Sequence, residues 1–170
     1  AKDIPVRFAT LKPGTASEFV IKAMFKKGYN TDYEKLKKKG WTFEFTSYEN
    51  GADLMADNHL DLFAFSVGKV ASIVMNIESS TPIYILPVGQ KALDALAGAY
   101  GTTTFTVEPG VYKSVKEPIR TIGDFNCIVV RKDLPEDLVY ELNKAMWEGR
   151  AGITAAVKDF GELSIKDALP

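Results

Sequence analysis

The chain has few of the residues that build metal and disulfide sites, since its 170 residues include one cysteine, Cys127, and one histidine, His59. A single cysteine excludes an intrachain disulfide and a zinc site built on cysteine. His59 has no second histidine with which to share a metal ion, so we expect an exposed histidine, no metal site and no cofactor. Cys127 stands inside an apolar run, where we expect a buried, unreactive thiol.

The motifs of the common α/β enzymes are also missing. The sequence has no G-x-S-x-G elbow, no Walker motif and no G-x-G-x-x-G fingerprint. No nucleophile stands beside a matching base, and the acidic pair Glu136 and Asp137 is what the start of a helix prefers. We therefore expect no catalytic residues, and an α/β enzyme is the alternative.

Long apolar runs and a strong net charge are absent. No run is long enough to span a bilayer, and no charged-then-apolar leader opens the chain, although a cleaved leader would leave no trace. The formal net charge is −1, but the first 45 residues hold ten lysines and arginines against five acids. The densest basic run, residues 35–39, has no interleaved aromatics and is typical of the solvated end of a short helix. We therefore expect no nucleic-acid partner.

What the sequence does contain is a regular alternation of apolar runs and helix-like stretches. Strands are predicted at about 4–10, 41–46, 61–66 and 83–87, and helices near 16–28, 47–57, 69–77 and 89–98. Such alternation predicts an α/β protein with a mostly parallel, twisted sheet flanked by helices. The loops after residues 10, 46 and 66 would then meet at the carboxyl edge of the sheet, where open α/β sheets bind their ligands. Ser47 is the expected cap of the second helix.

The second half of the chain has a different pattern. Residues 101–121 contain several threonines, glycines and prolines, and they predict a connector with one short strand at 105–107. An apolar strand is expected at 125–131. A helix should follow to about Trp147, where Gly149 would end it, and one or two short helices should complete the chain.

The turn after the first strand is the most informative segment, because a Pro-Gly loop precedes small polar residues there. The N–H groups and the dipole of a helix start attract anions, and Lys12 adds a cation. We therefore predict that Gly14, Thr15, Ala16 and Ser17 bind a ligand carboxylate, with the Thr15 or Ser17 hydroxyl as an added donor. The alternative is an ordinary helix cap.

Four motifs stand in a recognisable order along the chain. They are Gly14-Thr15 in the first turn, Asp61 at the start of a strand, the Pro-Gly-Val-Tyr loop at 109–112, and the run VRKDLPEDLVY at 130–140. With these motifs the chain resembles the TAXI-type solute-binding proteins of TRAP transporters. The resemblance implies a type II periplasmic-binding-protein-like fold whose two lobes close on a small carboxylate, glutamate and glutamine among the reported ligands. It also implies an exported, periplasmic or extracytoplasmic receptor that delivers its ligand to a TRAP-type membrane permease.

The resemblance also divides the chain and marks a departure from the family. Residues 1–118 would form the second lobe, and residues 119–170 would supply the strand and helices that return to a first lobe, most of which is missing. One lobe alone should bind weakly, or two copies should associate by exchanging elements. The family pattern Gly-Ser-Gly-Thr is Lys-Pro-Gly-Thr here, so Pro13 removes an N–H donor while Lys12 adds a cation.

Four further residues become candidate ligand contacts through the resemblance. Phe65, Ser66 and Gly68 follow the third strand and would face the cleft, where an aromatic ring can pack on the aliphatic part of a ligand. Tyr112, near the hinge, could donate its phenol to the ligand. Core packing of the two rings and simple turn chemistry are the alternatives. A third functional class is an interaction or antigenic surface protein that kept the fold and lost the pocket.

Overall fold

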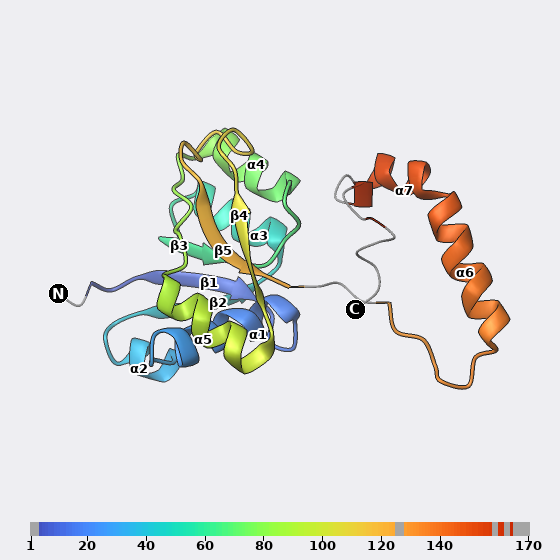
Figure 1. The fold of residues 1–170 in the computed structure, drawn as a ribbon. Helices are drawn as coiled ribbons and strands as arrows, with labels where there is room; N and C mark the ends of the chain where they lie inside the picture. Colours follow the sequence, from blue (N-terminus) through green and yellow to red (C-terminus); the bar gives the residue numbers. More distant parts are fainter. Residues whose placement is uncertain (1–3, 125–127, 158–159, 162–163, 165–170) are drawn as a thin grey trace. The chain divides into compact units, whose positions relative to one another are not determined.

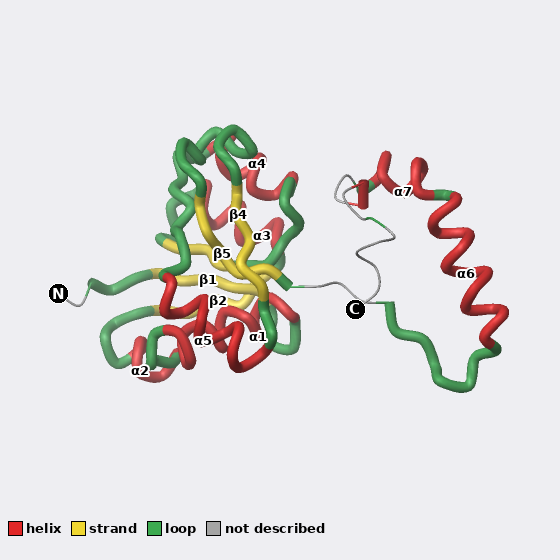
Figure 2. The backbone as a smooth tube through the Cα atoms, in the orientation of Figure 1, coloured by secondary structure: helices red, strands yellow, loops and turns green. Residues whose placement is uncertain are grey.

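The computed structural model describes residues 4–124, 128–157, 160–161 and 164. The chain divides into two units, the first made of Ala1–Val67 and Ala71–Asp124 and the second of Gly68–Val70 and Phe125–Pro170. Figure 1 shows the elements of both units along the chain. All strands of the described chain belong to the first unit, as Figure 2 shows, and the helical carboxyl-terminal segment belongs to the second.

Three parallel strands form the main sheet of the first unit. β1 (Arg7–Leu11) lies between β2 (Thr42–Thr46) and β3 (Leu62–Ala64). Parallel neighbours need crossover connections, and helices supply them here. The strands match the first three predicted runs to within a few residues, so the predicted α/β fold with a parallel sheet is confirmed.

Helices connect and cover these strands. Their bounds are α1 (Ala16–Ala23), a π-helical turn η1 (Met24–Gly28), α2 (Tyr33–Lys37), α3 (Tyr48–Ala56), α4 (Ser72–Ser80) and α5 (Gln90–Tyr100). Three helices start with a side-chain cap, in which Thr15, Asp32 or Ser47 accepts a hydrogen bond from an N–H of the first turn. These caps satisfy N–H groups that have no carbonyl partner within the helix. The predicted cap at Ser47 is confirmed.

The two faces of the main sheet pack against different helices. On one face Phe8, only 1% exposed, packs with Ile21 of α1 and with aromatic rings, its centroid lying 5.5 Å from that of Phe25 and 5.3 Å from that of Phe43. On the other face α3 comes so close that a Cβ at Gly51 would stand 2.2 Å from the Phe63 ring. Figure 1 shows α1 and α3 on opposite sides of the strands.

A second, two-stranded sheet completes the first unit. β4 (Thr103–Val107) pairs with the antiparallel β5 (Ile119–Gly123). The sequence predicts β4 and misses β5, because the prolines and glycines around it are typical of a connector. β5 pairs with β4, and the first unit runs to Asp124.

The strand predicted at 83–87 is wrong. This segment lies outside both sheets, although it keeps some alternation of burial, with Ile83 packed partly on the core and Tyr84 72% exposed. A strand needs a hydrogen-bonded neighbour along its length. Ile83 and Ile85 pack on the core that includes Ile119 of β5, and one residue past the segment the Val88 N–H donates to the Arg120 carbonyl of β5 at 2.9 Å. These contacts do not form a strand ladder.

The second unit carries two helices in its described part. α6 (Glu136–Glu148) starts after Pro135 and ends at Gly149, which confirms its prediction, and α7 (Arg150–Ala156) follows. The strand predicted at 125–131 is wrong for its described part. Residues 128–131 form no strand, and Ile128 is 76% exposed, because no described segment of this unit offers a strand to pair with. Cys127 lies outside the described residues.

Candidate functional site

The carboxyl ends of β1, β2 and β3 lie at one edge of the main sheet, because the three strands are parallel and in register. The loops that follow these ends lead into α1, into α3 and toward α4. Helices α1 and α3 therefore both present their amino-terminal turns at this edge. The sequence predicts this convergence of loops, and the structure confirms it through contacts between them, described next.

The loop from β1 to α1 is shaped as an exposed turn with a capped helix start. Gly14 has a φ of +91°, which favours glycine, and the Thr15 hydroxyl donates to the Lys12 carbonyl at 2.9 Å and accepts the Glu18 N–H at 3.2 Å. The Thr15 hydroxyl is thus the helix cap, and its proton is used within the loop. Lys12, Gly14 and Ala16 are exposed, and the first-turn N–H groups of Ala16 and Ser17 have no partner within the helix.

Ser17 connects this loop to the one after β3. Its side chain is buried, its Oγ accepts the Ser66 N–H at 2.9 Å and lies 3.5 Å from the Ser66 carbonyl oxygen. The hydroxyl that the sequence offers as a ligand donor is therefore engaged inside the protein. For the ligand, only the backbone N–H of Ser17 fits the predicted role.

Tyr48, in the first turn of α3, is part of this edge and was missed by sequence reasoning. Its hydroxyl donates to the Ser66 carbonyl at 2.8 Å, and its ring meets the half-buried Phe65 ring edge-on, with centroids 5.7 Å apart. The Phe65 ring also lies 4.5 Å from that of Phe63. The only sequence signal for Tyr48 is its place directly after the cap at the end of β2.

The one acid in the first turn of α1 is buried away from solvent. The Glu18 side chain is 9% exposed and its carboxylate lies 3.9 Å from the Lys22 amine. Burial raises the pKa of Tyr33, and the nearby Glu18 carboxylate raises it further. At the end of β1, the Thr10 hydroxyl is completely buried and has no hydrogen-bond partner among the described residues. Glu18 thus faces Lys22 of α1 and lies beside Tyr33 of α2, and the exposed residues of the loop are free of acids.

The remaining predicted contacts divide into two cases. Tyr112 is 4% exposed within a core that also holds Val74 and Val115, and its hydroxyl accepts the Ala71 N–H at 3.0 Å. This position fits the packing alternative to the ligand role predicted for Tyr112. Gly68 belongs to the segment Gly68–Val70, which groups with the second unit, and it is placed only along the chain, two residues after Ser66.

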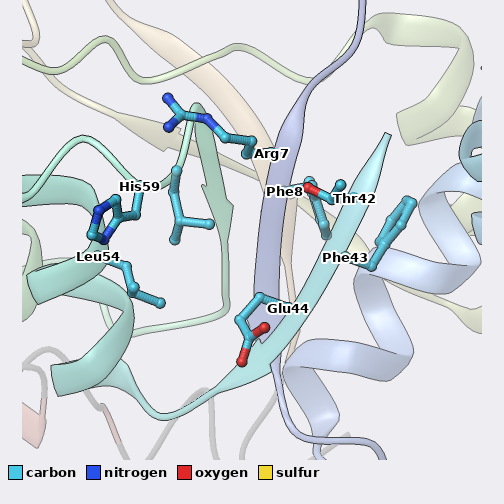
Figure 3. A pocket seen from close by; sticks show the side chains of 8 residues that line it. Arg7, Phe8, Thr42, Phe43, Glu44, Leu54 and His59 are labelled. Carbon is cyan, nitrogen blue, oxygen red and sulfur yellow. The ribbon is translucent and has the colours of Figure 1, made fainter. Parts of the chain in front are cut away.

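A recess of about 360 Å³ lies beside β1 and β2 (Figure 3). It is lined by Arg7, Phe8, Thr42, Phe43, Glu44, Leu54, His59 and Leu60. Its one arginine, Arg7, donates to Asp61 at 2.7 Å, and these hydrogen bonds lower the pKa of Asp61 to about 2. His59 is exposed, as expected. Among the described residues, no three metal-ligating side chains gather here or elsewhere.

Comparison with known protein families identifies the family to which this architecture belongs. A model described as the NMT1-like family matches residues 7–170. The chain belongs to the NMT1-like family. NMT1-like proteins are periplasmic-binding-protein-like, which agrees with the α/β unit seen here and indicates a solute-binding function. Binding proteins of the NMT1-like family are typically extracytoplasmic. No curated protein matches the chain, and no helix in its described part is long and apolar enough to cross a bilayer.

Proposed function

We propose that this NMT1-like protein is an extracytoplasmic receptor that binds a small carboxylate, with glutamate and glutamine as first candidates, and delivers it to a TRAP-type membrane permease. The observation that carries the proposal is the start of α1 at the carboxyl edge of the sheet, beside the exposed Lys12 and Gly14. Family membership supports the solute-binding part. The motif at residues 130–140 supports the TRAP-type part.

The chemistry at the start of α1 suits an anion. The groups available there are donors, namely the N–H groups of Ala16 and Ser17 and the Lys12 amine, whereas Glu18 is buried beside Tyr33. A hydrogen bond to a charged group contributes about 1.5–3 kcal/mol, and the helix dipole adds to it. Such a site holds a carboxylate without covalent chemistry, so the proposal includes no catalytic step.

The proposal also assigns a role to the second unit. Water at an open edge weakens the attraction between a carboxylate and its donors, so a receptor of this kind closes a second wall over its ligand. The exposed Ile128 and Val129 and the exposed Leu142 of α6 are the kind of surface that another lobe covers. Without a second wall over the ligand, we expect weak affinity or association of two copies.

The test removes one N–H donor from α1 and leaves the helix intact. Ala16 is the first residue of α1, where proline is tolerated, and the extended conformation of Thr15 suits a residue before proline. We expect Ala16→Pro to weaken binding of glutamate, glutamine and succinate by about tenfold or more, because one charge-assisted hydrogen bond is lost. Titration calorimetry measures this, with NMR titration for millimolar affinities.

The matched control is Ala16→Ser, which keeps the N–H and changes only an exposed side chain. It should bind like the wild type, and both variants should keep the wild-type unfolding midpoint. Wild-type protein that binds none of the three acids, or an Ala16→Pro variant that binds them as well as wild type does, would contradict the proposal.

A further inference from the structure

The backbone of Ser66 is held at both of its polar groups. Its N–H donates to the Ser17 Oγ at 2.9 Å, and its carbonyl accepts the Tyr48 hydroxyl at 2.8 Å. One contact comes from the first turn of α1 and the other from the first turn of α3. The loop after β3 is therefore joined to both helix starts at the carboxyl edge.

These two contacts reach Ser66 from opposite faces of the sheet. Leu62 and Ala64 of β3 pack on the core that includes Ile21 of α1, whereas Phe63 lies under Gly51 of α3. Alternate residues of a strand point to opposite faces, so α1 and α3 cover different faces, as Figure 1 shows. A loop that is hydrogen-bonded from both faces of the sheet has little freedom to move away from either helix start.

Tyr48 is itself firmly placed. The Ser47 cap, whose Oγ accepts the Asn50 N–H at 3.2 Å, sets Tyr48 as the first residue of α3. Its ring packs edge-on against Phe65, at an interplanar angle of 84°. The phenol oxygen therefore has a defined position, from which it reaches the Ser66 carbonyl.

We propose that Tyr48 is a positioning residue for the ligand site, which holds the Ser66 loop against the start of α1 before the ligand arrives. This inference rests on the proposed function. Because the Ser66 N–H and carbonyl are both engaged, the loop offers the ligand its Ser66 hydroxyl and its Phe65 ring. A loop fixed in advance costs less entropy when the ligand binds, so the Tyr48 hydrogen bond contributes to affinity without touching the ligand.

Tyr48→Phe tests the inference, because it removes the hydroxyl and keeps the ring against Phe65. We expect affinity for glutamate and succinate to fall about threefold to tenfold, with a less favourable binding entropy by calorimetry. Amide exchange at Ser66 should quicken in the free protein and slow again when glutamate is added. A global loss of stability would quicken exchange at the β1 amides as well, whereas a loosened loop would quicken it only at and around Ser66.

Tyr29→Phe is the matched control, because the Tyr29 hydroxyl accepts the Gly89 N–H at 3.4 Å at the start of α5. This variant should keep wild-type affinity and wild-type exchange at Ser66. If wild-type protein binds the probes and Tyr48→Phe binds them equally well, the inference is overturned and the proposed function stands. If wild-type protein binds neither probe, the proposed function fails, and unchanged Ser66 exchange in Tyr48→Phe would then show that Tyr48 does not hold the loop either.

Discussion

Helices α5 and α6 carry apolar residues at the same helical spacing, yet α5 buries Ala92, Leu93 and Leu96 whereas α6 buries none of its residues. Leu96 is 1% exposed, and Leu142 is 54% exposed. The difference lies in what each helix meets. α5 packs against η1, where Gly28 allows a very close approach, and the described part of the second unit offers α6 only the short α7. An apolar stripe on a helix therefore becomes buried only where a second surface packs against it.

This contrast predicts unequal contributions to stability. Helices gain most of their stability from packing an apolar face, and short isolated helices are marginal in water. The first unit has two aromatic and aliphatic cores, one around Phe8 and one around Val115. We expect it to unfold cooperatively, whereas α6 and α7, which have no side-chain cap at their starts, depend on helix propensity.

The largest expected effect breaks the core of the first unit. Phe8→Ala should lower the free energy of unfolding by about 3–5 kcal/mol, because it removes a fully buried ring from a cluster of aromatics. Leu142→Ala in α6 should change it by less than about 0.5 kcal/mol, since most of that side chain is exposed. Urea unfolding followed by circular dichroism measures both. A cost above 1 kcal/mol for Leu142→Ala, on the order of a buried contact, would show that α6 is packed in solution.

A smaller effect tests the close approach that buries α5. A Cβ at Gly28 would stand 2.5 Å from the Ala92 Cβ, so Gly28→Ala should cost about 1–3 kcal/mol of unfolding free energy by forcing η1 and α5 apart. Gly98→Ala in α5 is the control, because nothing lies within 4 Å of its Cβ position. It should raise stability by about 0.5–1 kcal/mol through helix propensity. Equal thermal midpoints for the two variants would refute the packing account.

The smallest effect concerns the exposed ion pair of Arg7 and Asp61, which ties β1 to the start of β3. Hydrogen bonds from the Arg7 side chain and N–H lower the pKa of Asp61 from 3.8 to about 2. The charged form is favoured in the folded state, so the stabilisation is complete above about pH 4 and is lost as the pH falls to about 2. Asp61→Asn should therefore be less stable than wild type near neutral pH, and this difference should shrink over that window.

Two observations would sharpen this last prediction. High salt should reduce the difference between Asp61→Asn and wild type, because both side chains are 42% exposed. Asp57→Asn removes the same charge from an exposed residue nearby and controls, near neutral pH, for the loss of one carboxylate charge. If the loss of stability in Asp61→Asn did not depend on pH, the hydrogen-bond geometry of the contact, and not its charge, would be what stabilises the fold.

Local sequence patterns predict the elements whose defining residues lie close together in the chain. The alternating runs located β1, β2 and β3, Ser47 was recognised as a cap, and Gly149 was recognised as the end of α6. The loop before α1 was identified from its Pro-Gly turn and small polar residues. Each of these features depends on residues within a few positions, where hydrogen-bonding and periodicity rules apply directly.

Contacts between distant residues were not predictable in the same way. The sequence placed Ser17 and Tyr112 among the ligand contacts, but Ser66 lies 49 positions from Ser17 and Ala71 lies 41 positions from Tyr112. The sequence does not indicate the role of Tyr48, because its hydrogen-bond partner is the backbone carbonyl of Ser66. Every residue has such a carbonyl, so no residue type at that position marks the contact. The runs at 83–87 and 128–131 read as strands because strand propensity is local, whereas strand pairing is not.

The sequence by itself determined the α/β class, the positions of the first three strands, and a carboxyl edge lined by a glycine turn and a helix start. Tertiary structure alone decided which hydroxyls remain available at that edge, which aromatic rings are buried, and which apolar runs become strands or stay exposed. The physical reason is that periodicity and capping act within one segment. Hydrogen-bond satisfaction and burial depend on the segment that arrives opposite.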